Sequence, residues 1–126
     1  MRGAGPMATG WQFVKIVQSW LVRVKQYQTL LARARAEAWG WNPERRRAVG
    51  ERLNRARKLL LEASSVLDRE AAAAGVDVST RIKHVAEEGR EEGQAPLAQM
   101  GLILQEQVLD ALKGLKAVYE EGLYAV

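Results

Sequence analysis

The stretch WGWNP, at residues 39–43, separates two long helical patterns and decides the fold. Asparagine is favoured at the N-cap of a helix and proline at its first position, so Asn42 and Pro43 predict a helix start. No other proline occurs between residues 10 and 74. A connection of only a few residues makes consecutive helices antiparallel neighbours, so the sequence predicts an αα-hairpin over residues 10–74.

Apolar residues recur on both sides of this turn at alternating spacings of four and three, which is the heptad pattern of packed helices. At 1.5 Å per residue, each of the two helices should be about 45 Å long. Thr9 and Gln12 match a capping box at the start of the first helix. The two stripes predict the core of the hairpin: Phe13, Val17, Trp20, Val24, Tyr27, Leu31, Ala34 and Ala38, then Val49, Leu53, Ala56, Leu60, Ala63 and Leu67.

The remainder of the chain predicts one short and one long helix. Residues from about 79 to 91 indicate a short helix or a mobile acidic connector, because Gly89 and Gly93 should loosen its end. A long C-terminal helix is predicted over residues 95–124. Its apolar surface is wider than a single hairpin groove requires, so it should have a second partner surface. The surplus residues proposed as a protein interface are Leu102, Leu109 and Leu123.

The predicted fold is therefore an all-α antiparallel bundle of three long helices plus one short helix, with the C-terminal helix packed along the groove of the hairpin. Ala, Leu, Arg, Glu and Lys make up about half of the chain, a composition typical of long helices. Residues 1–8 contain two glycines and a proline and are predicted to form a disordered tail. Residues 9–126 are predicted to form a single domain.

Composition removes most catalytic and metal chemistry from consideration. The chain has no cysteine and a single histidine, His84, which has no second histidine or cysteine to complete a metal site. No nucleophile, base and orienting group are found together, so we expect no catalytic residues, cofactor, metal or small-molecule substrate. No uncharged stretch approaches the roughly 20 apolar residues of a membrane span. We expect a protein of the cytoplasm, or of a particle assembled there, without a membrane partner.

Charge is distributed unevenly along the chain. Residues 1–63 hold 13 Lys and Arg against 4 Glu, whereas residues 64–126 hold 6 Lys and Arg against 11 Asp and Glu. The two halves could neutralise each other within one molecule, between copies, or through an anionic partner. The sequence does not choose among these three.

One flank of the second predicted helix carries basic side chains and no acid. A strip of this kind on a rigid helix could bind the phosphate backbone of a nucleic acid. Such binding is electrostatic and does not depend on the base sequence. The alternative is an ordinary solvated face, or pairing with the acidic half of the chain. The candidate nucleic-acid contacts are Arg46, Arg47, Arg57 and Lys58, extended on the first helix by Lys15 and Arg33.

Two tryptophans, Trp39 and Trp41, lie in the turn at the tip of the hairpin. They could fold back over the open end of the bundle, with Trp41 stacked against Arg46 in a cation–π pair. The alternative is an exposed aromatic anchor for a protein partner or a platform for bases.

Together these features predict a non-catalytic helical assembly or interaction subunit. It would pack helix against helix with copies of itself or with an obligate protein partner. The alternative is sequence-independent nucleic-acid backbone binding by the basic face of the first two helices, as in a small subunit of a nucleoprotein complex.

Overall fold

The computed structural model describes residues 9–37 and 40–120, and over these residues its regular secondary structure is helical, with no strand. Its helices are α1 (Gly10–Glu37), α2 (Pro43–Ala73), α3 (Val78–Glu91) and α4 (Ala95–Glu120). The predicted all-α class is confirmed, and the segment predicted as a short helix or a connector is a helix of 14 residues. The predicted N-terminal tail, Trp39, Leu123 and the end of the C-terminal helix lie outside the described residues.

The two helices of the hairpin begin at the caps expected from the sequence. Thr9 and Gln12 form the reciprocal bonds of a capping box: the Thr9 N–H donates to Gln12 Oε1 over 3.0 Å, and the Gln12 N–H donates to Thr9 Oγ1 over 3.3 Å. Asn42 accepts a 2.8 Å hydrogen bond from the Arg45 N–H, and Pro43 is the first residue of α2. Local sequence therefore determines where α1 and α2 start.

A side-chain cap defines the start of α3, and a glycine defines its end. Asp77 caps its start by accepting a 2.7 Å hydrogen bond from the Thr80 N–H. Hydrogen bonds from the backbone and side chain of Thr80 hold the pKa of Asp77 below its ordinary value. Gly75 and Gly93 have positive φ angles of 76° and 73° and terminate α2 and α3, a conformation that glycine adopts without steric cost.

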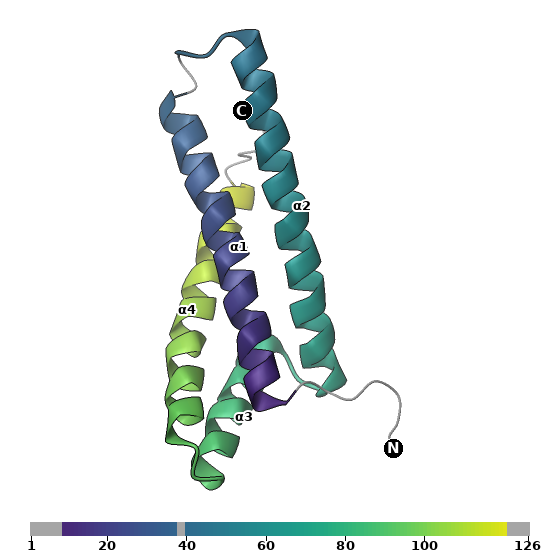
Figure 1. Cartoon of the computed structure of the whole chain (residues 1–126), viewed down its shortest axis with the longest axis vertical. Coiled ribbons are helices and arrows are strands. Elements are labelled where there is room, and N and C mark those ends of the chain that lie inside the picture. Colours follow the sequence, from purple (N-terminus) through teal and green to yellow (C-terminus); the bar gives the residue numbers. More distant parts are fainter. Residues whose placement is uncertain (1–8, 38–39, 121–126) are drawn as a thin grey trace.

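In Figure 1, α1 and α2 lie side by side, and α4 passes beside and behind α1, with its end between α1 and α2 in this view. α1 and α4 run in the same direction, since Gln18 near the start of α1 bonds to Met100 near the start of α4. We expected α4 to pack along the groove of the hairpin, and this is wrong. α4 instead packs on α3 and α1 and has little contact with α2.

The reason for this displacement is the close packing of α3 on α4. Gly89 and Gly101 are buried where the two helices meet. A Cβ atom on Gly101 would lie only 2.7 Å from the Cβ of Ala86, and one on Gly89 only 2.8 Å from the backbone nitrogen of Ala98. Gly89 therefore allows a close helix–helix approach. The prediction that Gly89 loosens the end of this helix is wrong, because the glycine is buried in the contact between α3 and α4.

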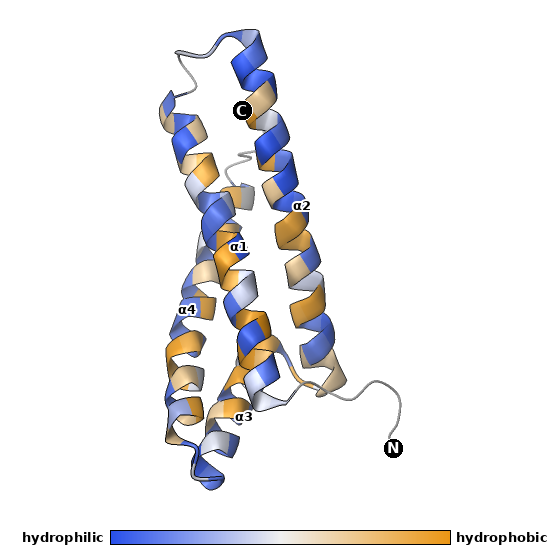
Figure 2. Ribbon diagram, in the orientation of Figure 1, coloured by the Kyte–Doolittle hydropathy of each residue, from blue (hydrophilic) through white to orange (hydrophobic). Residues whose placement is uncertain are grey.

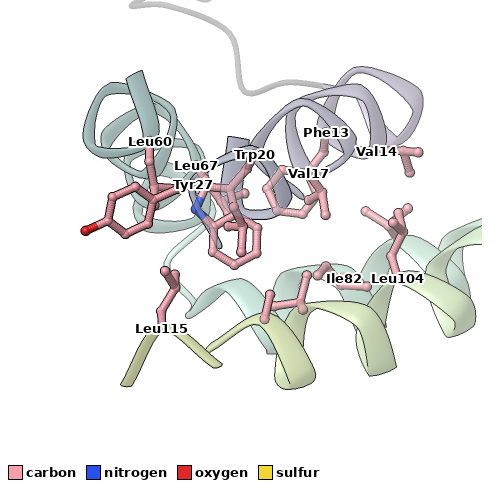
Figure 3. Close-up of a cluster of buried hydrophobic side chains, with 14 of the residues drawn as sticks. Phe13, Val14, Val17, Trp20, Tyr27, Leu60, Leu67, Ile82, Leu104 and Leu115 are labelled. Carbon is pink, nitrogen blue, oxygen red and sulfur yellow. The ribbon is translucent and has the colours of Figure 1, made fainter. Parts of the chain in front are cut away.

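The core is a continuous apolar cluster centred on α1. Figure 3 shows Trp20 and Tyr27 of α1 among side chains from the other helices, with Leu115 of α4 pointing toward them. The predicted α1 stripe is buried from Phe13 to Ala34. On α2 the buried apolar residues are fewer, because only α1 covers most of its length: Leu53, Leu60, Leu67 and Ala71.

Candidate interaction surfaces

The displacement of α4 leaves an apolar groove between α2 and α4, of about 820 Å³. Trp20 of α1 forms part of its floor, and the first residues of α3 close one end. Leu61 on α2 and Leu112 on α4 line the groove while remaining almost half exposed. We call this surface the α2–α4 groove; its apolar lining is Trp20, Leu61, Leu67, Val78, Val108, Leu112 and Leu115.

The side of α4 that points away from the core is also apolar. Leu102 is 51% exposed and Leu109 is 44% exposed, and Ile103 beside them is 54% exposed. Glu106 and Asp110 are exposed on the same side, since residues three and four apart are neighbours on a helix. We call this surface the α4 outer face and define it by Leu102, Ile103, Glu106, Leu109 and Asp110.

A second groove, of about 600 Å³, lies between α1 and α2. Its floor is apolar, and Lys25, Arg52 and Arg55 are the charged residues that line it. None of these three forms an ion pair with another residue that the structure describes. We call this surface the α1–α2 groove; its apolar lining is Val22, Leu30, Ala56 and Leu59.

The groove continues toward the tip of the hairpin as a smaller cavity of about 330 Å³. Trp41 is half-buried there and packs against the core cluster. Its ring is covered by Arg45, whose guanidinium carbon lies 5.9 Å from the ring centroid, and not by Arg46 as predicted. Arg45 also pairs with Glu37 over 3.4 Å. The first turn of α2 thus points Arg45 back toward α1 and leaves Arg46 exposed.

The structure separates the six cations predicted to contact nucleic acid. Arg46, Arg47 and Lys58 are exposed on α2, whereas Arg57 is half-buried. Lys15 lies near the start of α1, at the opposite end of the hairpin from the start of α2 (Figure 1). Arg33 is exposed and lines the cavity at the tip with Arg45 and Arg52.

Sequence reasoning missed the cations that line the α1–α2 groove. Arg52 and Arg55 lie on the flank of α2 that also carries Glu44, Glu51 and Glu62, so this flank had no clear charge signal. None of these glutamates is among the residues lining the groove, so cations alone provide its charge. Which flank of α2 borders α1 depends on helix packing and has no signature in the charge pattern.

Arg81 was also missed as a structural residue. Its side chain is only 7% exposed, and its guanidinium carbon lies 5.1 Å from the centroid of the Phe13 ring. Arg81 also pairs with the exposed Glu88 over 3.6 Å. An arginine can bury its aliphatic stem against apolar side chains while its charged group finds a partner. Arg81 therefore joins α3 to the start of α1.

Among the residues with a described placement, no group of three or more His, Cys, Asp or Glu side chains is arranged to hold a metal ion. His84 is exposed on α3. No helix within residues 9–37 and 40–120 combines the length and apolar composition that crossing a lipid bilayer requires. Comparison with protein-family models, with curated proteins and with solved structures finds no match for this chain.

Proposed function

We propose that the chain is a non-catalytic assembly subunit that binds through helix-to-helix packing, either with further copies or with a helical partner protein. The observation that carries the proposal is the apolar surface formed by the α2–α4 groove and the α4 outer face. Leu102, Leu109 and Leu112 follow one another along the solvent-facing side of α4, at spacings of seven and three residues. This spacing is one that a docked helix can cover.

The physical argument is the cost of leaving this surface in water. Apolar area removed from water contributes about 25 cal/mol per Å². Contiguous exposed apolar patches on soluble proteins mark interaction sites more often than isolated exposed side chains do. The α2–α4 groove also occupies the position that a fourth long helix would fill in a bundle, and no described residue fills it.

The test is the oligomeric state of the purified chain, measured by size-exclusion chromatography with light scattering over a range of concentrations. The parent chain should form a discrete oligomer. Replacing two apolar residues together, Leu109→Glu and Leu112→Glu, should weaken association at least tenfold with unchanged helix content. Val66→Glu, at an exposed valine outside the grooves described above, is the matched control. A parent chain that stays monomeric and binds no helical partner in a defined reconstitution contradicts the proposal.

A second candidate function is binding of a nucleic-acid backbone by the distal part of the hairpin. Residues 25–58 carry ten Lys and Arg against three Glu, a net charge of +7. Figure 1 shows this part of the hairpin extending beyond the end of α4, and Figure 2 shows that the start of α2 is largely hydrophilic. Arg46, Arg47 and Lys58 are exposed there without an ion pair to any described residue.

This second function predicts binding to a generic oligonucleotide that weakens steeply with salt, because bound cations displace counterions from the phosphates. The triple reversal R46E/R47E/K58E should reduce affinity at least tenfold, measured by fluorescence anisotropy. The matched control K83E/R90E/K113E makes the same change in net charge at exposed residues of α3 and α4. Equal losses in both variants would show that only net charge matters and would contradict a binding surface on the hairpin.

A further inference from the structure

We propose that the α4 outer face of one copy binds in the α1–α2 groove of a second copy. The inference rests on the helix-packing function proposed above and identifies the partner as the chain itself. It joins two different surfaces of the molecule, so the contact is heterologous and each copy carries both a donor helix and an acceptor groove.

The acceptor groove has the chemistry of a site for an acidic amphipathic helix. Val22, Leu30 and Leu59 contribute to an apolar lining between the two helices. Arg52 and Arg55 lie one helical turn apart on α2, and both are exposed. An incoming helix could bury apolar side chains against the lining while its carboxylates meet the two guanidinium groups on the α2 wall.

The α4 outer face carries the matching groups. Leu102 and Leu109 are seven residues apart and therefore lie on one line along the helix. Glu106 and Asp110 are four residues apart, and both lie to the same side of that line, one turn from each other. When the leucine line faces the groove floor, both carboxylates point toward the same wall.

The spacing of the charges on the two surfaces agrees. Side chains three or four apart on a helix have Cβ atoms about 5 to 6 Å apart, which applies both to the pair Arg52 and Arg55 and to the pair Glu106 and Asp110. Two carboxylates one turn apart can therefore meet two guanidinium groups one turn apart. Lys113 follows on the same side of α4, so the acidic part of the face is confined to residues 102–110.

Within one copy no residue of α4 lines the α1–α2 groove, so the α4 outer face of the same chain does not fill it. Asp110 does line a neighbouring groove between α1 and α4, which shares Val22 and Lys25 with the α1–α2 groove of the same copy. Glu106 is outside that lining, so its charge is available to a neighbour without a competing cation in the groove.

The experiment is charge reversal followed by complementation, read by sedimentation velocity at low salt. R52E/R55E disables the groove, and E106R/D110R disables the α4 outer face. Each variant alone should associate at least tenfold more weakly than the parent chain. An equimolar mixture of the two should recover association, and so should the quadruple variant, because opposite charges again face each other.

Matched controls apply the same changes outside the two surfaces. R46E/R47E reverses two exposed arginines on α2, and E87R/E91R reverses two exposed glutamates spaced four apart on α3. Both should associate like the parent chain. The single variant E106R separates the effect between copies from any change at the α1–α4 groove, and it should also weaken association. Circular dichroism should show parental helix content in every variant.

The outcomes distinguish this inference from the function on which it rests. Association that is sensitive to L109E/L112E but unchanged by the charge reversals overturns the inference and leaves the helix-packing function standing. Loss in both reversed variants without recovery in the mixture or the quadruple variant also overturns it. A parent chain that never self-associates overturns the inference, while reconstitution with a helical partner would then still support the packing function.

Discussion

The indole N–H of Trp20 donates a 2.8 Å hydrogen bond to the hydroxyl oxygen of Ser64, which joins the centre of α1 to α2. Trp20 is almost completely buried, so its N–H has little access to water. Trp20 and Ser64 also line the α2–α4 groove. One side-chain pair thus fixes the register of the hairpin and shapes a candidate binding surface.

Removing the acceptor should destabilise the protein. Ser64→Ala leaves the Trp20 N–H without its hydrogen-bond partner, and an unsatisfied buried donor costs about 1 to 3 kcal/mol. Trp20→Phe removes the donor together with part of the packing and should cost at least as much. Urea denaturation gives the free energies of unfolding. The double variant should be less destabilised than the sum of the two single changes, and strict additivity would contradict an energetic coupling.

The two glycines Gly101 and Gly50 should respond in opposite ways to alanine. At Gly101 a new methyl group would clash with the backbone and side chain of Ala86, so Gly101→Ala should lower the free energy of unfolding by about 1 to 3 kcal/mol. At Gly50, within α2, a Cβ atom meets nothing within 4 Å. Gly50→Ala should therefore stabilise the protein by about 0.5 to 1 kcal/mol.

Both variants are compared with the parent chain by thermal and urea unfolding. Since each gains the same intrinsic helix propensity, their difference reports the contact between α3 and α4. Stabilisation by Gly101→Ala similar to that by Gly50→Ala would show that the two helices are not closely packed at this point.

Arg81 should contribute more to stability than its ion-pair partner. Arg81→Ala removes a buried stem from the Phe13 ring and should cost about 2 kcal/mol or more. Glu88→Gln should cost less than about 1 kcal/mol, because Glu88 is half exposed and water already screens the pair. Denaturation of the two variants tests the order. An equal or larger effect at Glu88 would contradict a role for Arg81 through packing.

The N-cap of α3 should make stability depend on acidity. Hydrogen bonds from Thr80 lower the pKa of Asp77 from its ordinary value of 3.8, so the folded state favours the carboxylate. The stabilisation is complete above the unfolded pKa and is lost as the pH falls through the lower folded pKa. Asp77→Asn keeps an oxygen acceptor without the charge, so its difference from the parent chain should be constant near neutrality and change only in acid.

An NMR titration of the Asp77 carboxyl carbon measures the folded pKa directly. A midpoint at or above 3.8 would contradict the cap as the source of this acid dependence.

Local patterns predicted the elements and much of the core. The heptad stripe of α1 is buried at every predicted position from Phe13 to Ala34, because a single helix buries the same face wherever its partners lie. On α2, Val49, Ala56 and Ala63 from the predicted stripe are only partly buried. Full burial of these residues would require a third helix in the groove of the hairpin. Where that helix lies is set by contacts between residues far apart in the chain.

The candidate surfaces were less predictable than the elements. The exposed leucines of α4 were anticipated because the apolar surface of that helix exceeds one seam. The α1–α2 groove was not, because Arg52 and Arg55 share a flank with glutamates that prove to lie outside the groove lining. The sequence placed Trp41 correctly at the tip of the hairpin. It did not identify Arg45 as the arginine that covers the ring, because this depends on how the first turn of α2 is rotated about the helix axis.

The amino-acid order alone determined that this chain is helical, where α1 and α2 begin and which face of α1 is buried, because caps and apolar periodicity act over a few residues. Only the tertiary structure decided where α4 lies, since the close contact of Gly101 with Ala86 pulls α4 toward α3 and away from α2. That displacement opens the α2–α4 groove and leaves the α4 outer face toward solvent. It arises from packing between segments far apart in the chain, which no local pattern encodes.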